Sequence, residues 1–377
     1  MKKIAFNTPL RNNKYFTNVK NFLNSKESLH GPGKNIFKIK KELKNKFGFK
    51  NLYLTNSCTA AIEMAALALN LNKDDEVLMP SYTFVTTGSS FARTGCKIKY
   101  IDISNENLMP TFSEIKKKTN KNTKAIVIVH YQGFSVDYLD KLQAFCRKKK
   151  IFLIEDAAQA LGSYFKNKPL GSFGDFGCFS FHHTKNLHAG IGGLLSVNNS
   201  KFKKKISFIF DKGTDRSLVI TNKRKYYSWV EIGSCFLLPE LNASFLQPQI
   251  KDMGKISKYR SKIYFRYLKN FKNWLTDEFL VCNNYKYTYN FHALVIILKK
   301  NERVNFLKYL SKFNIHAFIG YVPLHKSPAG KKYIKNNFKL INTDRLEKKI
   351  IRLPLHTELT IDDIDFVCKK IKLFFKK

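Results

Sequence analysis

The chain has 377 residues, of which 44% are hydrophobic and 14% aromatic, so a packed core is expected and a disordered chain is excluded. The formal net charge of +39 raises the possibility of a nucleic-acid-binding protein. However, the lysines are scattered in short runs, without an arginine cluster or interleaved aromatic side chains. We therefore expect a basic surface that has no nucleic acid as its partner.

The cysteines and the apolar segments indicate the cellular compartment of the protein. None of the seven cysteines belongs to a C-x-x-C pair, and several lie within apolar runs, which predicts free thiols in a reducing compartment. The first residues lack the apolar segment of a signal peptide, and no run of about 18 apolar residues is present to cross a membrane. We expect a cytoplasmic protein with no membrane partner and no metal site.

The N-terminal half of the sequence alternates between strand and helix patterns. Residues 34–46 have apolar side chains at helical spacing and are followed by Gly48, a residue that commonly ends helices. Residues 51–55 predict a strand, and the small and hydroxyl residues after it predict a helix start. The pattern then predicts strands near 76–79, 97–101, 124–129 and 151–155, and helices near 84–92, 111–118, 137–149 and 157–161. This alternation predicts an α/β fold with a largely parallel sheet covered by helices on both faces.

Beyond Pro239 the pattern changes. A long helix is predicted from about 240 to 274. A strand near 292–298, a helix near 302–313 and a C-terminal helix near 361–375 follow. We therefore divide the chain into a large domain, residues 1–250, and a smaller α+β domain, residues 251–377, against which residues 1–30 can also pack.

Asp156 follows the buried strand pattern of "IFLIED". In open α/β sheets, ligands bind beside the carboxyl ends of the strands, so this carboxylate can face a cationic ring nitrogen. An N-cap for a following helix is the structural alternative. Gln159 lies three residues further on and can face the same pocket.

Two other strand ends have side chains suited to a flat phosphorylated ligand. "TNSCTAA", residues 55–61, joins a strand to a helix start, where exposed N–H groups and hydroxyls can bind phosphate. The alternative is a simple helix cap. "PSYTFV", residues 80–85, has two aromatic side chains that can stack on a ring, although such residues more often belong to the core.

"SFHHTKNLHAGIGG", residues 180–193, places Lys185 among small residues after a strand. Burial lowers a lysine's pKa and makes its amine a nucleophile for carbonyl carbon. A phosphate site, a stacking aromatic ring, an aspartate for a pyridine nitrogen and a reactive lysine are together what pyridoxal 5′-phosphate (PLP) requires. The sequence therefore predicts a PLP enzyme.

These motifs resemble those of the DegT/DnrJ/StrS-type nucleotide-sugar aminotransferases, which have the fold-type I PLP-dependent architecture. The resemblance covers nearly the whole chain and includes "GPGK", "EDAAQALGS", "GSFGDFGCFSFHHTKN", "YVPLH" and "RLPLH". Within the family, "DKGTDRS" and "WVEIGSCFLLPELNASFL" are most similar to the dTDP-4-amino-4,6-dideoxygalactose transaminases.

The resemblance implies a role for each matching residue. Lys185 would hold the cofactor and shuttle the proton, Asp156 would keep the ring nitrogen protonated, and Gln159 would bind the ring hydroxyl. Phe84 would stack on the ring, while a partner subunit in a homodimer would contribute a segment within 211–237. The phosphate would be held by Ser57, Cys58, Thr59, Ala60 and Ser180, with Ser234 and Cys235 from the partner. The sugar nucleotide would contact Gly31, Gly33, His182, Tyr321 and His325.

The resemblance also implies substrates: L-glutamate and a nucleotide-linked 4-keto-6-deoxyhexose, for the synthesis of surface polysaccharide or lipopolysaccharide. Many relatives have a carboxylate where this chain has Ile191, and an asparagine where it has Cys235. "LVITNKRK", residues 218–225, lacks the usual aromatic-Arg-Gly pattern. Amination of a 3-keto sugar stays open as an alternative, as does a basic regulatory protein on an inactive aminotransferase scaffold.

Overall fold

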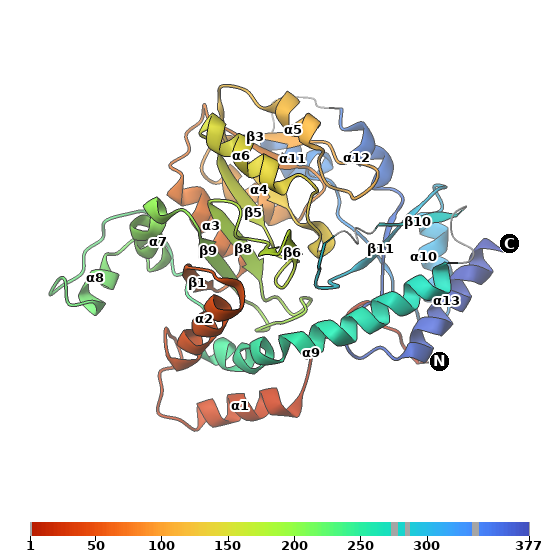
Figure 1. Cartoon of the computed structure of the whole chain (residues 1–377), viewed down its shortest axis with the longest axis horizontal. Helices are drawn as coiled ribbons and strands as arrows, with labels where there is room; N and C mark the ends of the chain where they lie inside the picture. Colours follow the sequence, from red (N-terminus) through yellow and green to blue (C-terminus); the bar gives the residue numbers. More distant parts are fainter. Residues whose placement is uncertain (1, 273–277, 283–286, 334–338, 377) are drawn as a thin grey trace.

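The computed structural model describes residues 2–272, 278–282, 287–333 and 339–376. A seven-stranded sheet forms the centre of the larger part (Figure 1). Five neighbouring strands are parallel, while β9 runs antiparallel to both of its neighbours. In spatial order the strands are β1 (Asn51–Thr55), β9 (Gly193–Val197), β8 (Phe176–Ser180), β5 (Phe152–Asp156), β4 (Thr123–Val129), β2 (Glu76–Pro80) and β3 (Lys97–Ile101).

Both faces of this sheet are covered, which explains why its strands are almost entirely apolar. On β4, Ala125 and Val127 belong to one hydrophobic core, and Ile126 and Ile128 to the other, because successive side chains point to opposite faces. The first core is closed by α3 (Cys58–Ala68), α4 (Val85–Ala92) and α7 (Lys203–Phe210). The second is closed by α2 (Lys34–Phe47), α5 (Phe112–Lys118), α6 (Leu139–Lys149) and α9 (Glu240–Phe271).

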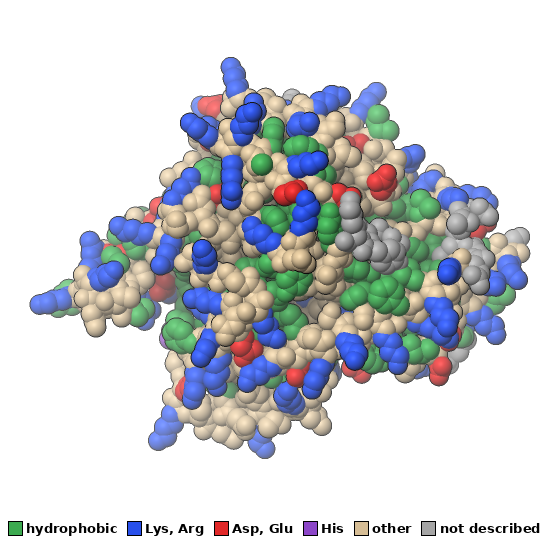
Figure 2. All heavy atoms as spheres, in the orientation of Figure 1, with side chains coloured by type: hydrophobic (Ala, Val, Ile, Leu, Met, Phe, Trp, Pro, Cys, Tyr) green, Lys and Arg blue, Asp and Glu red, His purple; other side chains and the backbone are tan. Residues whose placement is uncertain are grey.

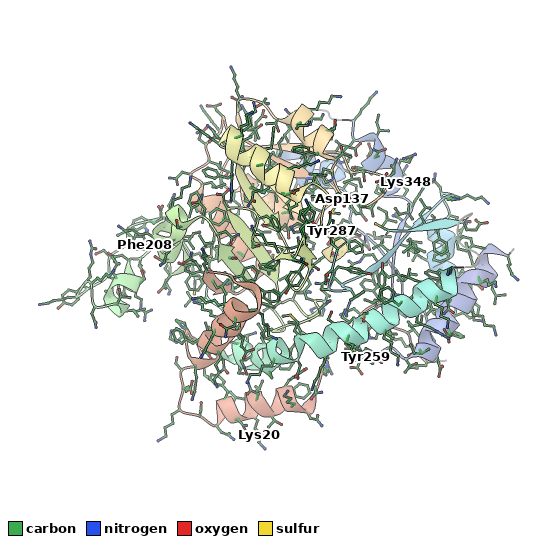
Figure 3. The ribbon with its side chains drawn as sticks, in the orientation of Figure 1. Lys20, Asp137, Phe208, Tyr259, Tyr287 and Lys348 are labelled. Atoms are coloured by element: carbon green, nitrogen blue, oxygen red, sulfur yellow. The ribbon has the colours of Figure 1, made fainter. Side chains whose placement is uncertain are left out.

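The 32-residue helix α9 connects the two sheets of the molecule (Figure 1). The second sheet is antiparallel, with the strand order β10 (Phe279–Cys282), β11 (Leu294–Leu298), β13 (Ile350–Leu353) and β12 (Phe318–Ile319). Helices α10 (Arg303–Ser311) and α13 (Ile361–Phe375) accompany it, and a capping box of Thr360 and Asp363 starts α13. Tyr259 of α9, labelled in Figure 3, donates a hydrogen bond to the carbonyl of Leu359 and so ties α9 to the segment before α13.

The N-terminal segment lies along this second part of the molecule. Ile4 pairs with Ile315 in an isolated bridge, and Lys2 forms an ion pair with Asp363. Helix α1 (Asn13–Leu23) lies along α9, where Lys14 and Tyr15 both bond Asp252. The remaining short elements are β6 (Tyr164–Phe165), β7 (Lys168–Pro169), α8 (Arg216–Ile220), α11 (Pro328–Tyr333) and α12 (Ile341–Leu346).

The structure confirms the predicted strands and most of the predicted helices, but it contradicts the helix predicted at 157–161. That segment makes tight turns, in which Ala160 donates to the carbonyl of Ala157 and Ser163 to that of Ala160. These bonds leave the side chain of Gln159 directed into tertiary contacts, described below. The long helix begins at Glu240 as predicted and ends at Phe271, while residues 273 and 274 of the prediction lie outside the described residues.

Two surface features bear on function. Lys and Arg side chains are spread over the whole face seen in Figure 2, without a single continuous basic patch. Of the part of the chain that the structure describes, no helix is both long enough and apolar enough to cross a membrane. The expectation that the positive charge serves no nucleic acid stays a prediction.

Candidate active site

A cavity of about 520 Å³ opens where the carboxyl ends of β5 and β8 approach the second sheet. One wall includes Asp156 and Ser180 at the strand ends of the large sheet and Lys185 in the turn after β8, and another includes Arg352 and Leu353 from β13. Carboxyl ends of parallel strands are where open α/β sheets bind ligands. The cavity is therefore the candidate active site.

Lys185 follows β8 through a tight turn, in which its own N–H donates to the carbonyl of His182 at 2.8 Å. The half-buried side chain reaches the cavity. Burial, followed by the positive charge of Arg352, lowers its pKa from 10.5 to about 8, against the opposing effects of Cys58 and Asp156. A substantial share of the amine is therefore neutral near neutral pH, and a neutral amine is the nucleophilic form.

Asp156 is 4% exposed at the end of β5. Its carboxylate accepts a hydrogen bond from the hydroxyl of Thr87 at 2.6 Å and another from the N–H of Ala158 at 3.2 Å. Thr87 in turn bonds Thr83. Burial raises the pKa of Asp156, whereas these hydrogen bonds and the charge of Lys185 lower it. A bound cation would stabilise the ionised form, which is what a protonated pyridine nitrogen supplies.

Gln159 is held at both ends of its amide. Its oxygen accepts from the N–H of Gln132 at 2.7 Å, and its nitrogen donates to the hydroxyl of Tyr321 at 2.7 Å. Gln132 has a left-handed backbone, with φ of 61°. The amide thus connects the large sheet to the loop after β12, and both Gln159 and Tyr321 line the cavity.

The start of α3 forms a further part of the wall. Ser57 caps the helix by accepting the N–H of Ala60 at 3.0 Å, and Ser57, Cys58 and Thr59 line the cavity. The first N–H groups of a helix have no partner within it and favour a bound anion. A Cβ at Gly193 would lie 2.3 Å from the backbone carbon of Ser57, so only glycine lets β9 approach this turn.

His130 lies at the end of β4, with its imidazole fully buried beside the cavity. Its Nε2 lies 2.8 Å from a carboxylate oxygen of Glu155. Glu155 also accepts from the N–H groups of Gly171, Phe173 and Gly174. Four hydrogen bonds hold this buried carboxylate and fix the orientation of the histidine ring.

The second sheet and the N-terminal segment contribute lining residues that the sequence analysis did not identify. Arg352 lies on β13, His292 two residues before β11, and Phe6 and Asn7 in the N-terminal segment. Burial and nearby cations lower the pKa of His292 well below 6.5, so its ring is neutral. The "RLPLH" motif was a signal for Arg352, but its side chain could not be placed in the site before the sheet was known.

Phe84, Ser180, His182 and Tyr321 line the cavity alongside Ile191. Phe84 is 52% exposed, with its ring 6.2 Å from that of Tyr321. The structure thus brings most of the predicted cofactor residues together. Ala60 is an exception, because it is buried within α3 and contributes only its N–H to the cap.

His325 does not line this cavity, and its predicted contact with the sugar nucleotide stays a prediction. Its ring bridges Ser81, at 2.7 Å, and Asp344, at 3.0 Å. Because Ser81 follows β2 and Asp344 lies in α12, the histidine joins the large sheet to the C-terminal part. Both ring nitrogens are engaged, so the structure gives His325 a tethering role within this chain.

Gly31 and Gly33 also lie outside the cavity, and their predicted contact with the nucleotide stays a prediction. The buried carboxylate of Glu240 accepts from the N–H groups of Gly33, Asn35 and Ile36. A Cβ at Gly33 would lie 2.9 Å from the Glu240 side chain. The glycines therefore allow a carboxylate to cap α2, which favours negative charge at its N-terminus.

Ser234 and Cys235 are exposed and lie outside the cavity of their own chain. They belong to an arm, residues 211–235, that includes α8 and projects from the body at the left of Figure 1. Cys235 accepts a hydrogen bond through its carbonyl from the side chain of Asn56. Their role toward a second subunit stays a prediction.

The cavity has the chemistry that PLP requires. A buried carboxylate, an amine of lowered pKa and the free N–H groups at the start of α3 surround one space. Over residues 10–372 the chain matches the model of the DegT/DnrJ/EryC1/StrS aminotransferase family.

The chain belongs to this family.

It is 30% identical over 351 residues, 90% of each chain, to an uncharacterized protein of Methanocaldococcus jannaschii. It is 29% identical to the UDP-4-amino-4,6-dideoxy-N-acetyl-beta-L-altrosamine transaminase of Campylobacter jejuni, covering 91% of this chain and 90% of the other.

A solved aminotransferase of pseudaminic acid biosynthesis from Helicobacter pylori has the same fold, with a TM-score of 0.90, full coverage of both chains and 24% identity. The fold is therefore that of PLP-dependent sugar aminotransferases, as predicted. Pyridoxal phosphate is the cofactor of this DegT/DnrJ/EryC1/StrS aminotransferase, whose structural neighbours include forms with PLP and with its amine form.

Proposed function

We propose that this aminotransferase moves the amino group of L-glutamate to the keto carbon of a nucleotide-linked 4-keto-6-deoxyhexose. The substrate we favour is dTDP-4-dehydro-6-deoxy-D-glucose, and the product dTDP-4-amino-4,6-dideoxy-D-galactose, a precursor of surface polysaccharide or lipopolysaccharide. The names of relatives that act on nucleotide sugars support the substrate class. The motif resemblance supports the particular sugar.

The observation that carries the proposal is the pairing of Lys185 and Asp156 in one cavity. The amine has a lowered pKa, and the carboxylate is buried at the neighbouring strand end. When bound, PLP supplies an electron-withdrawing ring that stabilises negative charge at the carbon bearing nitrogen. This chain then supplies the groups that position the ring and transfer the proton.

Each residue has a definite task in this scheme. Asp156, oriented by Thr87, keeps a positive charge on the ring nitrogen. The amine of Lys185, in its neutral form, takes a proton from the donor's carbon. It then returns a proton to the carbon of the cofactor. The N-terminus of α3, with Ser57 and Thr59, holds the phosphate.

We also propose that the protein works as a homodimer. The projecting arm exposes a group of large apolar side chains, and an exposed apolar patch of this kind marks an interface. These are Ile220, Tyr226, Tyr227, Trp229, Val230 and Ile232. In our proposal the arm covers the partner's cavity and brings Ser234 and Cys235 to its phosphate site. Light scattering of the wild type and of a Trp229→Ala, Ile232→Ala variant tests this: the wild type should have the mass of a dimer and the variant that of a monomer.

The function is tested by incubating the protein with PLP, L-glutamate and a panel of nucleotide-linked 4-keto and 3-keto sugars. We expect an aminated product from a 4-keto-6-deoxy sugar, with nitrogen on carbon 4 by NMR, and none from Lys185→Ala. Nitrogen on carbon 3 would replace the proposal by the 3-keto alternative. Absence of any cofactor absorbance, together with tight and salt-dependent DNA binding, would favour the regulatory alternative.

A further inference from the structure

His292 lies in the wall of the cavity that also contains Lys185. Its backbone is held two residues before β11, where the guanidinium of Arg260 donates to its carbonyl at 2.7 Å. Arg260 also donates to the carbonyls of Phe291 and Leu355. The buried imidazole therefore reaches the cavity from a rigid segment.

The hydrogen bonds of Asn186 determine which ring nitrogen of His292 has the proton. Asn186 directly follows Lys185, and its Nδ2 donates to the carbonyl of Asn290 at 2.7 Å. Its Oδ1 lies 3.0 Å from the Nδ1 of His292, and an amide oxygen can only accept. Because the ring is neutral, its single proton lies on Nδ1. Nε2 then has a lone pair and no proton.

His182 lines the same cavity with the opposite arrangement. The N–H and the hydroxyl of Thr184 lie 3.4 Å and 2.9 Å from its Nδ1, and a backbone N–H can only donate. Burial lowers the pKa of His182, so this ring is also neutral and its proton lies on Nε2. One imidazole of the cavity thus has a free donor, and His292 has a free acceptor.

The amine of Lys185 is a donor that this acceptor can serve. Within residues 2–272, 278–282, 287–333 and 339–376, the Nε2 of His292 has no hydrogen-bond partner. Lys185 is the charged group with the largest effect on the His292 ring, so the two side chains are neighbours in the cavity. The carboxylate of Asp156 already accepts from Thr87 and Ala158.

A neutral acceptor suits a lysine that has to act as a base. A second carboxylate beside Lys185 would stabilise the charged ammonium and raise its pKa. A neutral imidazole orients the amine through one hydrogen bond and stabilises its charge less, so the nitrogen lone pair stays available for the proton.

We propose that His292 is a positioning residue whose Nε2 accepts an N–H of the free Lys185 amine, and that Asn186 fixes the tautomer this requires. The inference rests on the proposed function, in which Lys185 transfers the proton, and it adds the group that aims the amine.

Nitrogen-15 NMR of the histidine rings tests the tautomer independently of turnover. In the full-length protein, with and without cofactor, we expect the His292 signals, assigned by their loss in His292→Asn, to show a proton on Nδ1. Asn186→Leu removes the acceptor and should shift the population toward a proton on Nε2. A proton on Nε2 of His292 in the wild type, or an unchanged tautomer in Asn186→Leu, would overturn the proposal.

Three variants separate the hydrogen bond from the shape of the ring. His292→Gln keeps an acceptor at the reach of Nε2, His292→Asn keeps only a group that faces Asn186, and His316→Asn is a control outside the cavity. In His292→Asn the saturating rates with L-glutamate and with keto sugar should both fall about 10- to 100-fold, as for a misplaced reacting group. His292→Gln should lose less than about fivefold, and KM should change less than about twofold in each variant.

The remaining outcomes distinguish this inference from the function itself. Wild-type rates in His292→Asn, or equal losses in His292→Gln and His292→Asn, would overturn the inference and leave the proposed function standing. A raised KM for one substrate at an unchanged rate would assign His292 to that substrate and would also overturn it. A wild type that converts L-glutamate but no nucleotide-linked sugar would overturn the proposed sugar substrate alone. A wild type that no amino acid converts would overturn both.

Discussion

The two walls of the cavity differ in how the fold satisfies their charged and amide side chains. On the large-sheet side, Asp156 and Gln159 have partners within the chain for both polar atoms of their side chains, while His130 is bonded at Nε2 and has a buried Nδ1 without a partner. On the second-sheet side, Arg352 has a buried donor with no partner. We expect the first wall, whose acid and amide are already positioned, to hold the cofactor, and the second to contact substrates.

The difference has a physical basis. A resident cofactor is held best by side chains whose positions are fixed before it binds, since less ordering entropy is then lost. A transient substrate needs an available donor, which the free protein must leave unsatisfied.

The largest expected effect comes from replacing Lys185 in the large-sheet wall. Lys185→Ala should lower turnover by about 10⁴-fold or more, because the proton-transfer group and the cofactor attachment are both lost. Borohydride reduction followed by peptide mass mapping should place the cofactor on residue 185 of the wild type only. Attachment of the cofactor at another lysine, or wild-type turnover in the variant, would contradict the role given to Lys185.

The next prediction compares the contributions to turnover of Asp156 and of Thr87, which orients its carboxylate. Asp156→Asn leaves the ring nitrogen without its counter-charge, and loss of one partner of a buried charge pair costs about 3–5 kcal/mol. We expect kcat to fall about 10²- to 10³-fold. Thr87→Val, which removes one hydrogen bond to this acid, should lower it about 10-fold or less. A larger loss in Thr87→Val would contradict the order.

A smaller effect concerns the stability of the protein without cofactor. Burial lowers the pKa of Lys185 from 10.5 to about 8, so its charged form is disfavoured in the folded state. Lys185→Met should therefore raise the free energy of unfolding at pH 7 by about 1–3 kcal/mol, from about 1.4 kcal/mol per pKa unit. The penalty is fully present below pH 8 and disappears as the pH rises toward 10.5. Thermal unfolding at pH 7 and pH 10 checks both the sign and this window.

The smallest expected effect is the influence of Arg352, in the second-sheet wall, on the pKa of Lys185 in the first. Capture of PLP by the apoenzyme requires a neutral amine, so its rate should rise with pH and reach half its maximum at about pH 8. Because Arg352 lowers the pKa of Lys185, Arg352→Gln should move this midpoint to higher pH, whereas Arg147→Gln, a matched control on the exposed side of α6, should not. Stopped-flow absorbance between pH 6 and 10 measures it. An unmoved midpoint would show that the two walls do not interact.

Sequence reasoning was most successful where function and fold share one short segment. Asp156 and Lys185 each follow a strand whose apolar pattern is readable, and their neighbours form contiguous motifs, so both could be placed at sheet edges. The helix wrongly predicted at 157–161 also came from reading a local pattern alone. The apolar "AAQAL" pattern suits a helix, but bonds from Gln159 to Gln132 and Tyr321 require turns instead.

The amino-acid sequence by itself determined the parallel sheet, the reactive lysine and its acid, because strand patterns and strand-end motifs depend on local order along the chain. Only the tertiary structure decided that Arg352, His292 and Phe6 face that lysine, and that His325 and Gly33 do not. Those positions depend on how a second sheet and an N-terminal segment fold back across more than 100 residues of chain. Packing of distant apolar surfaces fixes that arrangement, and no local periodicity encodes it.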